Sequence, residues 1–558
     1  MTPALVSGEL VAQTASEITP STFRPDPQRL TGAVVFSGET GLAAPEGADR
    51  LSVTIAGVDV EGTLPGLEET TAALEARLTR GPIRVSEIFE AASALEAAYV
   101  EAGFILARVV LPAQELRDGD RLRLVVVDGF VETIDTTAVP EEVRDRIIAL
   151  TESLIGKRGL RQRELERQLL LAGDTYGISL GSVLDVGASP GGTVIILQPR
   201  YRQVTGFVGF DNRQTDALGE WSLNAGAEFN GFLGFGEALY ARATGYPGDG
   251  YFSSTPRNRS FALGAALPVG TDGLSFNLEY TNSRTAPDTP GATTNSEFER
   301  LSFRAFYPVV RSRAFNVTGQ VSLDIQEDRL ELGGSGGTPV YIDETSVLRV
   351  SADALWLPES GGVFEAGAIL SFGLDALGAR TAADAAATST GLSRPGADAE
   401  FSKLELSGRA RWPLQENIAL TLAGRAQISF GDPLLTSEQI GIATISELSA
   451  FDDGTLNGDS GWVLRSELSS IYEMEVANYQ LDLRPYAFIA AGALHREAPV
   501  VPEAGTVHAE SFGIGIEAFR VRDQAFSTAS VRLELANGSR DDGGADGTRI
   551  TLFGSLRF

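Results

Sequence analysis

The sequence contains no cysteine, two histidines and only two lysines, Lys157 and Lys403. The lack of cysteine excludes a disulfide framework and any thiolate metal site, and two histidines cannot form a three-histidine zinc site. No window of about 18 uninterrupted apolar residues occurs, which excludes helical membrane spans but not barrel strands, whose outward and inward residues alternate. We therefore expect no metal or other cofactor.

Positive charge is also scarce, with 45 basic against 74 acidic residues and a net charge of −29. Nucleic-acid binding needs clustered lysine and arginine, so no nucleic-acid partner is expected. The phosphate-binding pattern G-x-x-x-x-G-K-[ST] is missing as well, because Gly156 and Lys157 lack the upstream glycine and the following hydroxyl. Nothing in the sequence therefore indicates nucleotide binding.

The N-terminal segment lacks the features of an export signal, because residues 1–16 contain no basic residue and only a broken apolar run. This leaves open whether a signal peptide has been trimmed or the chain is not exported. Residues up to about 50 are rich in proline, glycine, serine and threonine. This composition predicts an extended leader or linker over residues 1–50.

Two small modules of similar pattern follow the leader. In residues 51–129 an alternating segment precedes two stretches with apolar residues three and four positions apart, and two further strand-like segments close the module. The same order, β-α-α-β-β, recurs in residues 130–202, from VETIDTT through EEVRDRIIALTESLIG and RQRELERQLLLAGDTYG to GTVIILQPRY. We therefore expect two α+β domains in series.

From residue 203 to the C-terminus the helical period is replaced by alternating segments separated by Gly, Asp, Asn, Pro and Ser. Dividing roughly 355 residues by about 22 for each strand and its turn predicts on the order of 16 strands, an even number typical of outer-membrane barrels. The expected fold class is two small α+β domains followed by an all-β transmembrane barrel of about 16 antiparallel strands over residues 203–558. A soluble sandwich or propeller is less favoured, since no repeat of about 40 residues is present.

The order of landmarks resembles one family. The segment AAYVEAGFILARVVLPAQELRDGDRLRLVVVDGFVETI resembles the first polypeptide-transport-associated (POTRA) domain of two-partner secretion transporters of the haemolysin-activator and filamentous-haemagglutinin type. Downstream, NGFLGFGEAL, LPVGTDGLSFNLEYTNS and FYPVVRSRAF are similar to barrel segments of that family. So is TSEQIGIATISELSAFDDGTLNGDSGWVLRSEL, which the resemblance implies is a long loop, around residues 430–462, folded into the barrel lumen.

The resemblance implies a transporter in the outer membrane of a Gram-negative bacterium, with both POTRA domains in the periplasm. Its expected partner is a large secreted β-rich exoprotein, unfolded in transit and translocated through the barrel without nucleotide hydrolysis. Further expected partners are outer-membrane lipid and the periplasmic chaperones and barrel-assembly machinery that insert the barrel. Because recognition by β-augmentation uses sheet edges, the candidate cargo-docking residues are Arg108, Gln114, Arg121 and Arg123. Barrel closure is assigned to Asp211, Asn212 and Phe558.

Two departures from the family concern the lumenal loop. Where the family has a Val-Arg-Gly-aromatic tip, the chain reads Leu448, Ser449, Ala450, Phe451 and Asp452. The expected acidic partner of the missing arginine is replaced by Ala490. Losing both partners is coherent, because losing one would strand a buried charge at about 3–5 kcal/mol. Our hypothesis is that the loop is more mobile than usual or is held by other contacts, through Asp452, Asp453 and Asp459. No plug helix is expected before residue 50.

Three alternatives stay open. A passive pore or a degenerate relative without cargo explains the barrel but not residues 51–200. A barrel-assembly insertase would have more N-terminal domains and the arginine at the loop tip. A hydrolase would use Ser335, which lies in a literal G-x-S-x-G, but that glycine cluster lies between two strands and only His495 and His508 are available as a base. An enzyme is therefore not expected.

Overall fold

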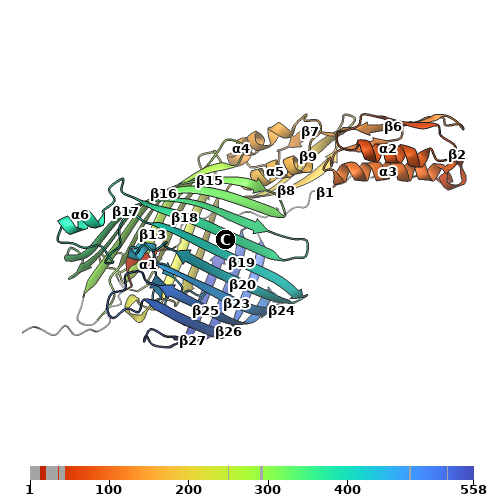
Figure 1. The fold of residues 1–558 in the computed structure, drawn as a ribbon. Coiled ribbons are helices and arrows are strands. Elements are labelled where there is room, and N and C mark those ends of the chain that lie inside the picture. Colours follow the sequence, from red (N-terminus) through yellow and green to blue (C-terminus); the bar gives the residue numbers. More distant parts are fainter. Residues whose placement is uncertain are drawn as a thin grey trace, which may run out of the picture. The chain divides into compact units, whose positions relative to one another are not determined.

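A computed structural model describes residues 13–20, 35–36, 44–248, 250–289, 293–476, 479–523 and 526–558. Most of the expected leader, residues 1–50, lies outside these ranges. The chain divides into two compact units, one holding the two α+β domains and the other holding the barrel together with residues 13–20 (Figure 1). No helix in the described part of the chain is long and apolar enough to cross a membrane.

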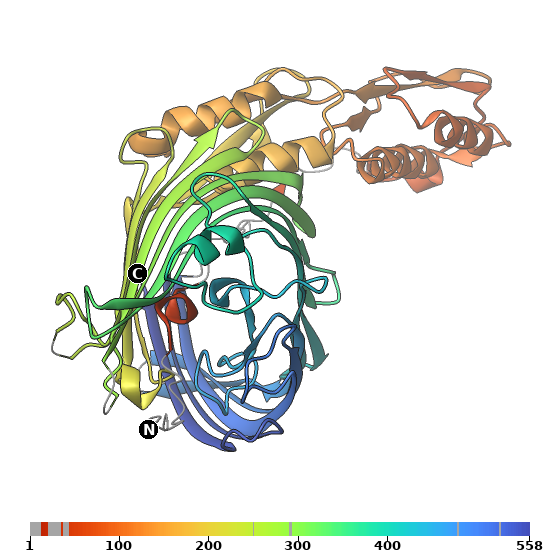
Figure 2. The same ribbon diagram turned by 60° about the vertical axis from the view of Figure 1, so that its left-hand side comes forward.

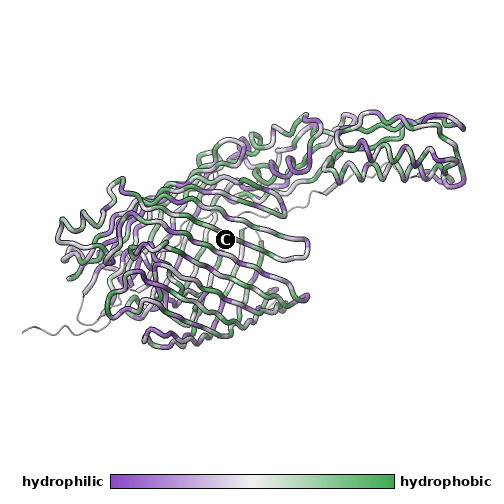
Figure 3. The backbone as a smooth tube through the Cα atoms, viewed as in Figure 1, coloured by the Kyte–Doolittle hydropathy of each residue, from purple (hydrophilic) through white to green (hydrophobic). Residues whose placement is uncertain are grey.

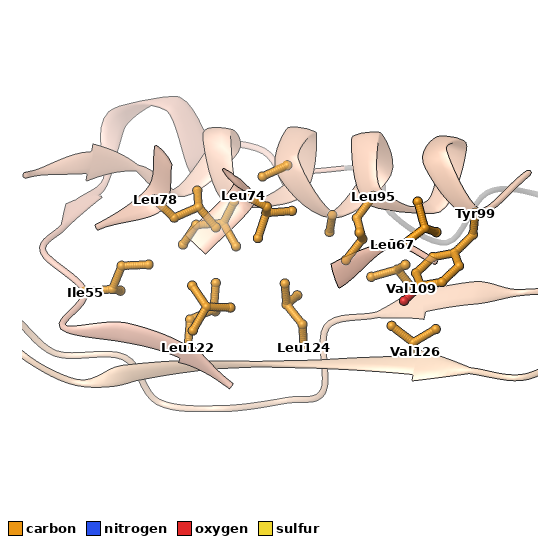
Figure 4. Close-up of a cluster of buried hydrophobic side chains, with 14 of the residues drawn as sticks. Ile55, Leu67, Leu74, Leu78, Leu95, Tyr99, Val109, Leu122, Leu124 and Val126 are labelled. Atoms are coloured by element: carbon orange, nitrogen blue, oxygen red, sulfur yellow. The ribbon is translucent and has the colours of Figure 1, made fainter. Parts of the chain in front are cut away.

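The first domain packs two helices on a small mixed sheet. Its elements are η1 (Ala48–Arg50), β2 (Ser52–Val53), β3 (Gly57–Glu61), α2 (Glu68–Leu78), β4 (Ile83–Arg84), α3 (Val85–Glu101), β5 (Arg108–Val110) and β6 (Arg121–Val127). The sheet order is β3-β6-β5, and β3 runs parallel to β6. Leu95 and Tyr99 of α3 face Leu122, Leu124 and Val126 of β6 across the core (Figure 4). The alternation of β6 thus supplies one wall of this core.

The second domain repeats this plan. It consists of β7 (Phe130–Asp135), α4 (Glu141–Thr151), η2 (Glu152–Leu154), α5 (Gln162–Gly173), β8 (Ile178–Val186) and β9 (Gly192–Tyr201). Its sheet has the order β1-β8-β9-β7, because the short strand β1 (Val35–Phe36) pairs in parallel with β8. A piece of the N-terminal segment therefore occupies the edge of this sheet that lies beside β8.

The remaining chain forms a closed antiparallel barrel of sixteen strands within the described residues, as predicted. The strands are β10 (Val204–Asp211), β11 (Ser222–Asn230), β12 (Ala238–Gly245), β13 (Asn258–Val269), β14 (Leu274–Thr285), β15 (Thr294–Arg311), β16 (Phe315–Leu332), β17 (Thr338–Trp356), β18 (Val363–Leu374), β19 (Ser402–Gln415), β20 (Ile418–Ile428), β23 (Ser460–Ser470) with β24 (Tyr472–Val476), β25 (Tyr479–His495), β26 (Thr506–Asp523), β27 (Ser527–Arg540) and β28 (Gly547–Arg557). β23 and β24 pair with the same neighbour, β25, and are two parts of one strand. The expected fold class is confirmed.

The alternation along the barrel strands separates an apolar outer face from a polar lumen. In β14 the side chains of Asn277, Glu279 and Thr281 are buried, whereas Leu278 and Tyr280 between them are exposed. Hydrophilic and hydrophobic residues alternate along the strands in the same way in Figure 3. This pattern suits a barrel whose outer face meets lipid and whose interior is polar.

Several short elements lie in the connections between strands. They are η3 (Asp216–Leu218), α6 (Ala382–Ala387), η4 (Thr436–Glu438), β21 (Ile440–Gly441) and β22 (Asn457–Gly458). The glycine cluster at residues 333–337 joins β16 to β17, which are antiparallel neighbours. Ser335 is therefore not on the strand-to-helix turn that a nucleophile elbow requires.

Candidate functional site in the barrel lumen

The connection between β20 and β23, residues 429–459, packs against the barrel wall as a lumenal loop. Its apolar residues are buried together with wall residues of β25, β26 and β27 in one cluster that includes Leu448, Phe451, Phe488, Ala490 and Ala536. β21 and β22 pair only with each other, so no backbone ladder joins the loop to the barrel sheet. Side-chain packing, side-chain hydrogen bonds and two isolated backbone hydrogen bonds hold the loop; the latter run from Asp459 N–H to the His495 carbonyl oxygen and from Asp453 N–H to that of Arg213.

The loop tip lies against two wall glycines. A Cβ atom added to Gly538 would lie 2.9 Å from the Ala450 Cβ, and one added to Gly547 would lie 2.3 Å from the Ala450 carbonyl oxygen. Larger residues at 538 and 547 would therefore push the tip away from the wall. Ala490 is buried in the same cluster as the tip. Ala490 and the tip residues on either side of Ser449 therefore belong to one apolar cluster.

Ser449, in place of the family's arginine, contacts an arginine of the wall. Arg465 of β23 donates to the Ser449 Oγ at 3.1 Å and pairs with Glu534 of β27 at 2.8 Å. The Arg465 guanidinium carbon lies 3.4 Å from the centroid of the Phe488 ring. A cation and a carboxylate therefore do meet at the loop tip, but both come from barrel strands.

A second anchor holds the start of the loop. Glu438 of η4 is 1 % exposed and accepts hydrogen bonds from Arg349 at 2.6 Å and from Gln326 at 2.7 Å. Lys403 forms an ion pair with it at 2.9 Å. Although burial alone would raise the pKa of Glu438, the charges of Arg349 and Lys403 hold that pKa well below its usual value. The loop start is therefore fixed by a carboxylate that shares two cations.

The three aspartates that we expected to hold the lumenal loop all have partners. Asp452 forms an ion pair with Arg549, and Asp453 pairs with Arg213 at 3.1 Å. Asp459 is fully buried and accepts from the backbone N–H of Leu434 at 3.0 Å and from that of Glu497 at 2.8 Å. These contacts connect the loop with β28, with the chain after β10 and with the connection after β25.

The expectation of no helix before residue 50 is wrong. α1 (Ala15–Ile18) is a short helix inside the ring of barrel strands (Figure 2). The Ala15 backbone N–H donates to the Ser296 Oγ at 3.0 Å, and the Ser16 hydroxyl donates to the Asp328 carboxylate at 2.7 Å. Asn457 of the lumenal loop donates to the Glu17 carboxylate at 2.7 Å. α1 therefore touches both the wall and the loop.

The Glu17 carboxyl of α1 is partly buried. It also accepts from the Thr14 backbone N–H at 2.7 Å, which caps the helix. Burial raises the pKa of Glu17 to about 7, despite the hydrogen bonds from Thr14 and Asn457. The docked helix therefore takes up a proton near neutral pH that a solvated glutamate would not hold.

The candidate docking residues of the first domain lie on or near β6. Arg121 forms an ion pair with Asp59 at 2.6 Å, and Arg123 forms one with Glu61 at 2.8 Å. These arginines lower the pKa of both acids. Gln114 donates to the Arg123 carbonyl oxygen at 2.8 Å, whereas Arg108 donates to the Ala107 carbonyl oxygen at 3.0 Å. The structure brings three of the four together and places Arg108 in a separate, backbone-bound position.

The residues expected at barrel closure lie at the junction of the first and last strands. β10 pairs with β28, and Phe558 exchanges two backbone hydrogen bonds with Gly206, at 2.8 and 2.9 Å. Asn212 donates to the Ile550 carbonyl oxygen at 3.0 Å and accepts from the Leu552 N–H at 2.8 Å. Its side-chain amide thus extends the ladder one step beyond β10. The Asp211 carboxylate accepts from the Asn224 side-chain amide at 3.0 Å.

Sequence reasoning missed the Glu438 anchor, the Arg465–Glu534 pair and the contacts of residues 13–19. One signal was available, since Lys403 is one of only two lysines and stands in an alternating strand. The partners of Glu438 lie 35 to 112 residues away from it in the chain, which no local pattern reveals. Within the ranges that the structure describes, no cluster of three or more His, Cys, Asp or Glu residues suits a metal ion.

Comparison with known proteins places these features in a family. Residues 191–517 match the haemolysin secretion/activation protein family ShlB/FhaC/HecB, and residues 53–129 match the ShlB-type POTRA domain. No curated protein sequence matches the chain.

Solved structures with the same fold include CdiB from Escherichia coli, with a TM-score of 0.70 and 19% identity over 98% of this chain and 95% of that one. CdiB from Acinetobacter baumannii has a TM-score of 0.62 and 15% identity over 96% and 95% of the two chains. BamA from Haemophilus ducreyi lacking POTRA domains 1–3 has a TM-score of 0.51 and 14% identity over 91% and 100%.

The family match covers more than half of the sequence and includes the barrel from β10 into β26, together with the lumenal loop described above. Its members are two-partner secretion transporters rather than enzymes, with a barrel in the outer membrane and POTRA domains in the periplasm. The resemblance seen in the sequence is thereby confirmed, and this chain belongs to the haemolysin secretion/activation family ShlB/FhaC/HecB.

Proposed function

We propose that this transporter recognises one large exoprotein, unfolded in the periplasm, and moves it through the barrel lumen without nucleotide hydrolysis. The main support for this proposal is that two segments outside the barrel sheet, α1 and the loop 429–459, occupy a polar lumen. Neither segment is part of the barrel sheet, so both can leave the lumen without breaking any hydrogen bond between barrel strands. A channel closed in this way opens without loss of the barrel.

Docking of the exoprotein is proposed to use backbone pairing. In the first domain the order β3-β6-β5 leaves both sheet edges without a neighbouring strand among the described residues. An extended segment of an unfolded protein can pair with such an edge, in the manner of β-augmentation. Arg121 and Arg123 already neutralise Asp59 and Glu61, so their proposed contribution is to keep β3 and β6 aligned beneath the docking edge.

Release at the cell surface supplies direction to transport. Folding of the emerging chain removes it from the unfolded pool and makes return unfavourable, so no nucleotide is required. The apolar outer face of the barrel suits contact with outer-membrane lipid. Insertion of the barrel by periplasmic chaperones and the barrel-assembly machinery belongs to the same proposal.

The test is deletion of the gene in its native host, followed by mass spectrometry of proteins in the medium and on the cell surface. We expect one large β-rich protein to disappear and to return when the gene is supplied on a plasmid. A second plasmid with the gene lacking residues 51–129 should fail to restore it. This second strain separates docking by the first domain from transport by the barrel.

Two other results would point elsewhere. An unchanged set of surface and secreted proteins would contradict cargo transport and favour a passive pore. Loss of many different barrels from the outer membrane would favour an insertase.

A further inference from the structure

The side chain of Arg465 has an unusual position for a barrel arginine. It is 4 % exposed and projects from β23, the strand that directly follows the lumenal loop. Its guanidinium stacks on Phe488 of β25. A planar guanidinium that stacks on a ring keeps its edge N–H groups free for hydrogen bonds, which a lysine ammonium does not do in the same geometry.

The N–H groups of this guanidinium form hydrogen bonds with both the loop and the barrel wall. Nη1 donates to the Ser449 Oγ at 3.1 Å and to the Ile445 carbonyl oxygen at 3.3 Å. Nη2 donates to the Glu534 carboxylate on β27 at 2.8 Å. One side chain therefore connects loop residues 445–449 with a strand on the far side of β25 and β26.

Glu534 is held firmly enough to serve as the fixed end of this connection. Its side chain is fully buried and accepts from the Tyr486 hydroxyl at 2.6 Å and from Arg532 at 2.9 Å. Arg532 also donates to the Tyr486 hydroxyl oxygen at 2.5 Å. The carboxylate thus keeps two partners if Arg465 is removed, so loss of Arg465 frees the loop without leaving Glu534 unpaired.

The register of the wall explains why this arrangement excludes an acid at position 490. Arg465 and Ala490 are directly opposite each other in the pairing of β23 with β25, so their side chains share one face of the sheet. The small Ala490 side chain leaves the guanidinium free to lie over Phe488. An aspartate there would compete with Glu534 for the same donors.

We propose that Arg465 is the positioning residue that holds the lumenal loop in the closed channel, with Glu534 as its fixed partner and Ser449 as its contact on the loop. The proposal rests on the proposed transport function, in which this loop must be held and then released. The cation of the loop contact is here supplied by the wall, whereas the resemblance implies a cation on the loop tip.

The absence of cysteine in the chain offers a direct assay. Ala443 of the loop is 2 % exposed and belongs to the apolar cluster between loop and wall. In an Ala443→Cys background, the labelling rate of the purified protein with a water-soluble maleimide reports how often the loop leaves the wall. We expect Arg465→Ala to raise this rate at least tenfold, and Arg465→Lys to raise it less, because lysine keeps the charge but loses the planar fork.

The matched control is Arg304→Ala. Arg304 is also a buried lumenal arginine paired with a glutamate, but its partners Asn277 and Glu279 belong to β14. Arg304→Ala should leave the Ala443→Cys labelling rate within twofold of the parent. Equal acceleration by both substitutions, or none with Arg465→Ala, would overturn the proposal.

Folding is checked by the heat-dependent shift of the barrel in gel electrophoresis. If Arg465→Ala does not give the folded band, Arg465→Gln and Arg465→Lys replace it, and labelling rates within twofold of the parent for both variants would equally overturn the proposal. The assay contains no exoprotein. An unchanged labelling rate therefore refutes the role of Arg465, whereas an unchanged set of secreted proteins after gene deletion refutes the transport function.

Discussion

The raised pKa of the partly buried Glu17 predicts that docking of α1 depends on pH. The pKa of Glu17 is raised from 4.5 to about 7 in the docked state, so the docked helix binds more protons than the released helix between these values. Docking is therefore strongest below pH 4.5, weakens as the pH rises to 7, and stays at its weakest above that. At about 1.36 kcal/mol for each pKa unit, the full change is about 3 kcal/mol.

The assay is the conductance of the purified protein in planar lipid bilayers with both chambers at the same pH. Between pH 5 and pH 8 the linkage relation gives a change of roughly 70-fold in the docking equilibrium. The wild-type channel should therefore be open more often at pH 8. Glu17→Gln has a similar shape and no titration, so its open probability should be low and nearly equal at both pH values.

Two control variants test whether Glu17 causes the pH dependence of channel opening. A variant lacking residues 13–19 should have a higher open probability than the wild type at pH 5, with the same value at both pH values. Glu447→Gln, which alters a lumenal carboxylate paired with Arg425 at 2.9 Å, should keep the wild-type response. Asp328, which accepts from Ser16, is an acidic neighbour of Glu17, and Asp343 lies opposite Asp328 on the next strand. A full pH response in Glu17→Gln would assign the effect to these wall carboxyls and refute the role of Glu17.

Three further predictions concern the other anchors. Glu438→Ala leaves two buried cations without their shared carboxylate and should destabilise the barrel by about 3–5 kcal/mol, seen as a lower urea midpoint in the heat-shift assay, with Glu438→Gln less affected. Leu95→Ala removes a side chain from the first domain core and should cost about 2–5 kcal/mol, measured as faster proteolysis of the N-terminal domains in the intact protein. Replacing Arg108, Arg121 and Arg123 by Glu places like charges beside β3 and should reduce export and exoprotein binding; unchanged binding would show that the first domain is not the docking surface.

The features predicted well are those with a regular local period. The alternation of residues 277–281, with polar and apolar side chains on opposite faces, is repeated along the barrel and determines both the strand count and the polar lumen. In the first domain, Ile88, Ala91, Ala92, Leu95 and Tyr99 recur at helical spacing and all face the sheet. A local pattern is sufficient here because each element buries one face against its neighbours.

α1 was not predicted because it has no such pattern. A helix of four residues is too short for a 3.6-residue period to be visible, and it would not be stable alone in water. Its stability comes from Ser296, Asp328 and Asn457, which are hundreds of residues away in the chain. The Glu438 anchor was missed for the same reason, since three different strands supply its partners.

The replacement of both members of the expected ion pair follows from the energetics of buried charge. A buried pair gains little over well-packed apolar groups, because desolvation offsets most of the Coulomb attraction, while a lone buried charge is costly. Ala450 and Phe451 at the tip and Ala490 on the wall now meet in an apolar cluster, which the glycines at 538 and 547 make possible by leaving space. If apolar packing alone replaced the ion pair, the loop would have no fixed orientation on the wall, because apolar surfaces can slide past each other. The hydrogen bonds of Arg465 fix that orientation, so the loop keeps one defined position without an arginine at its tip.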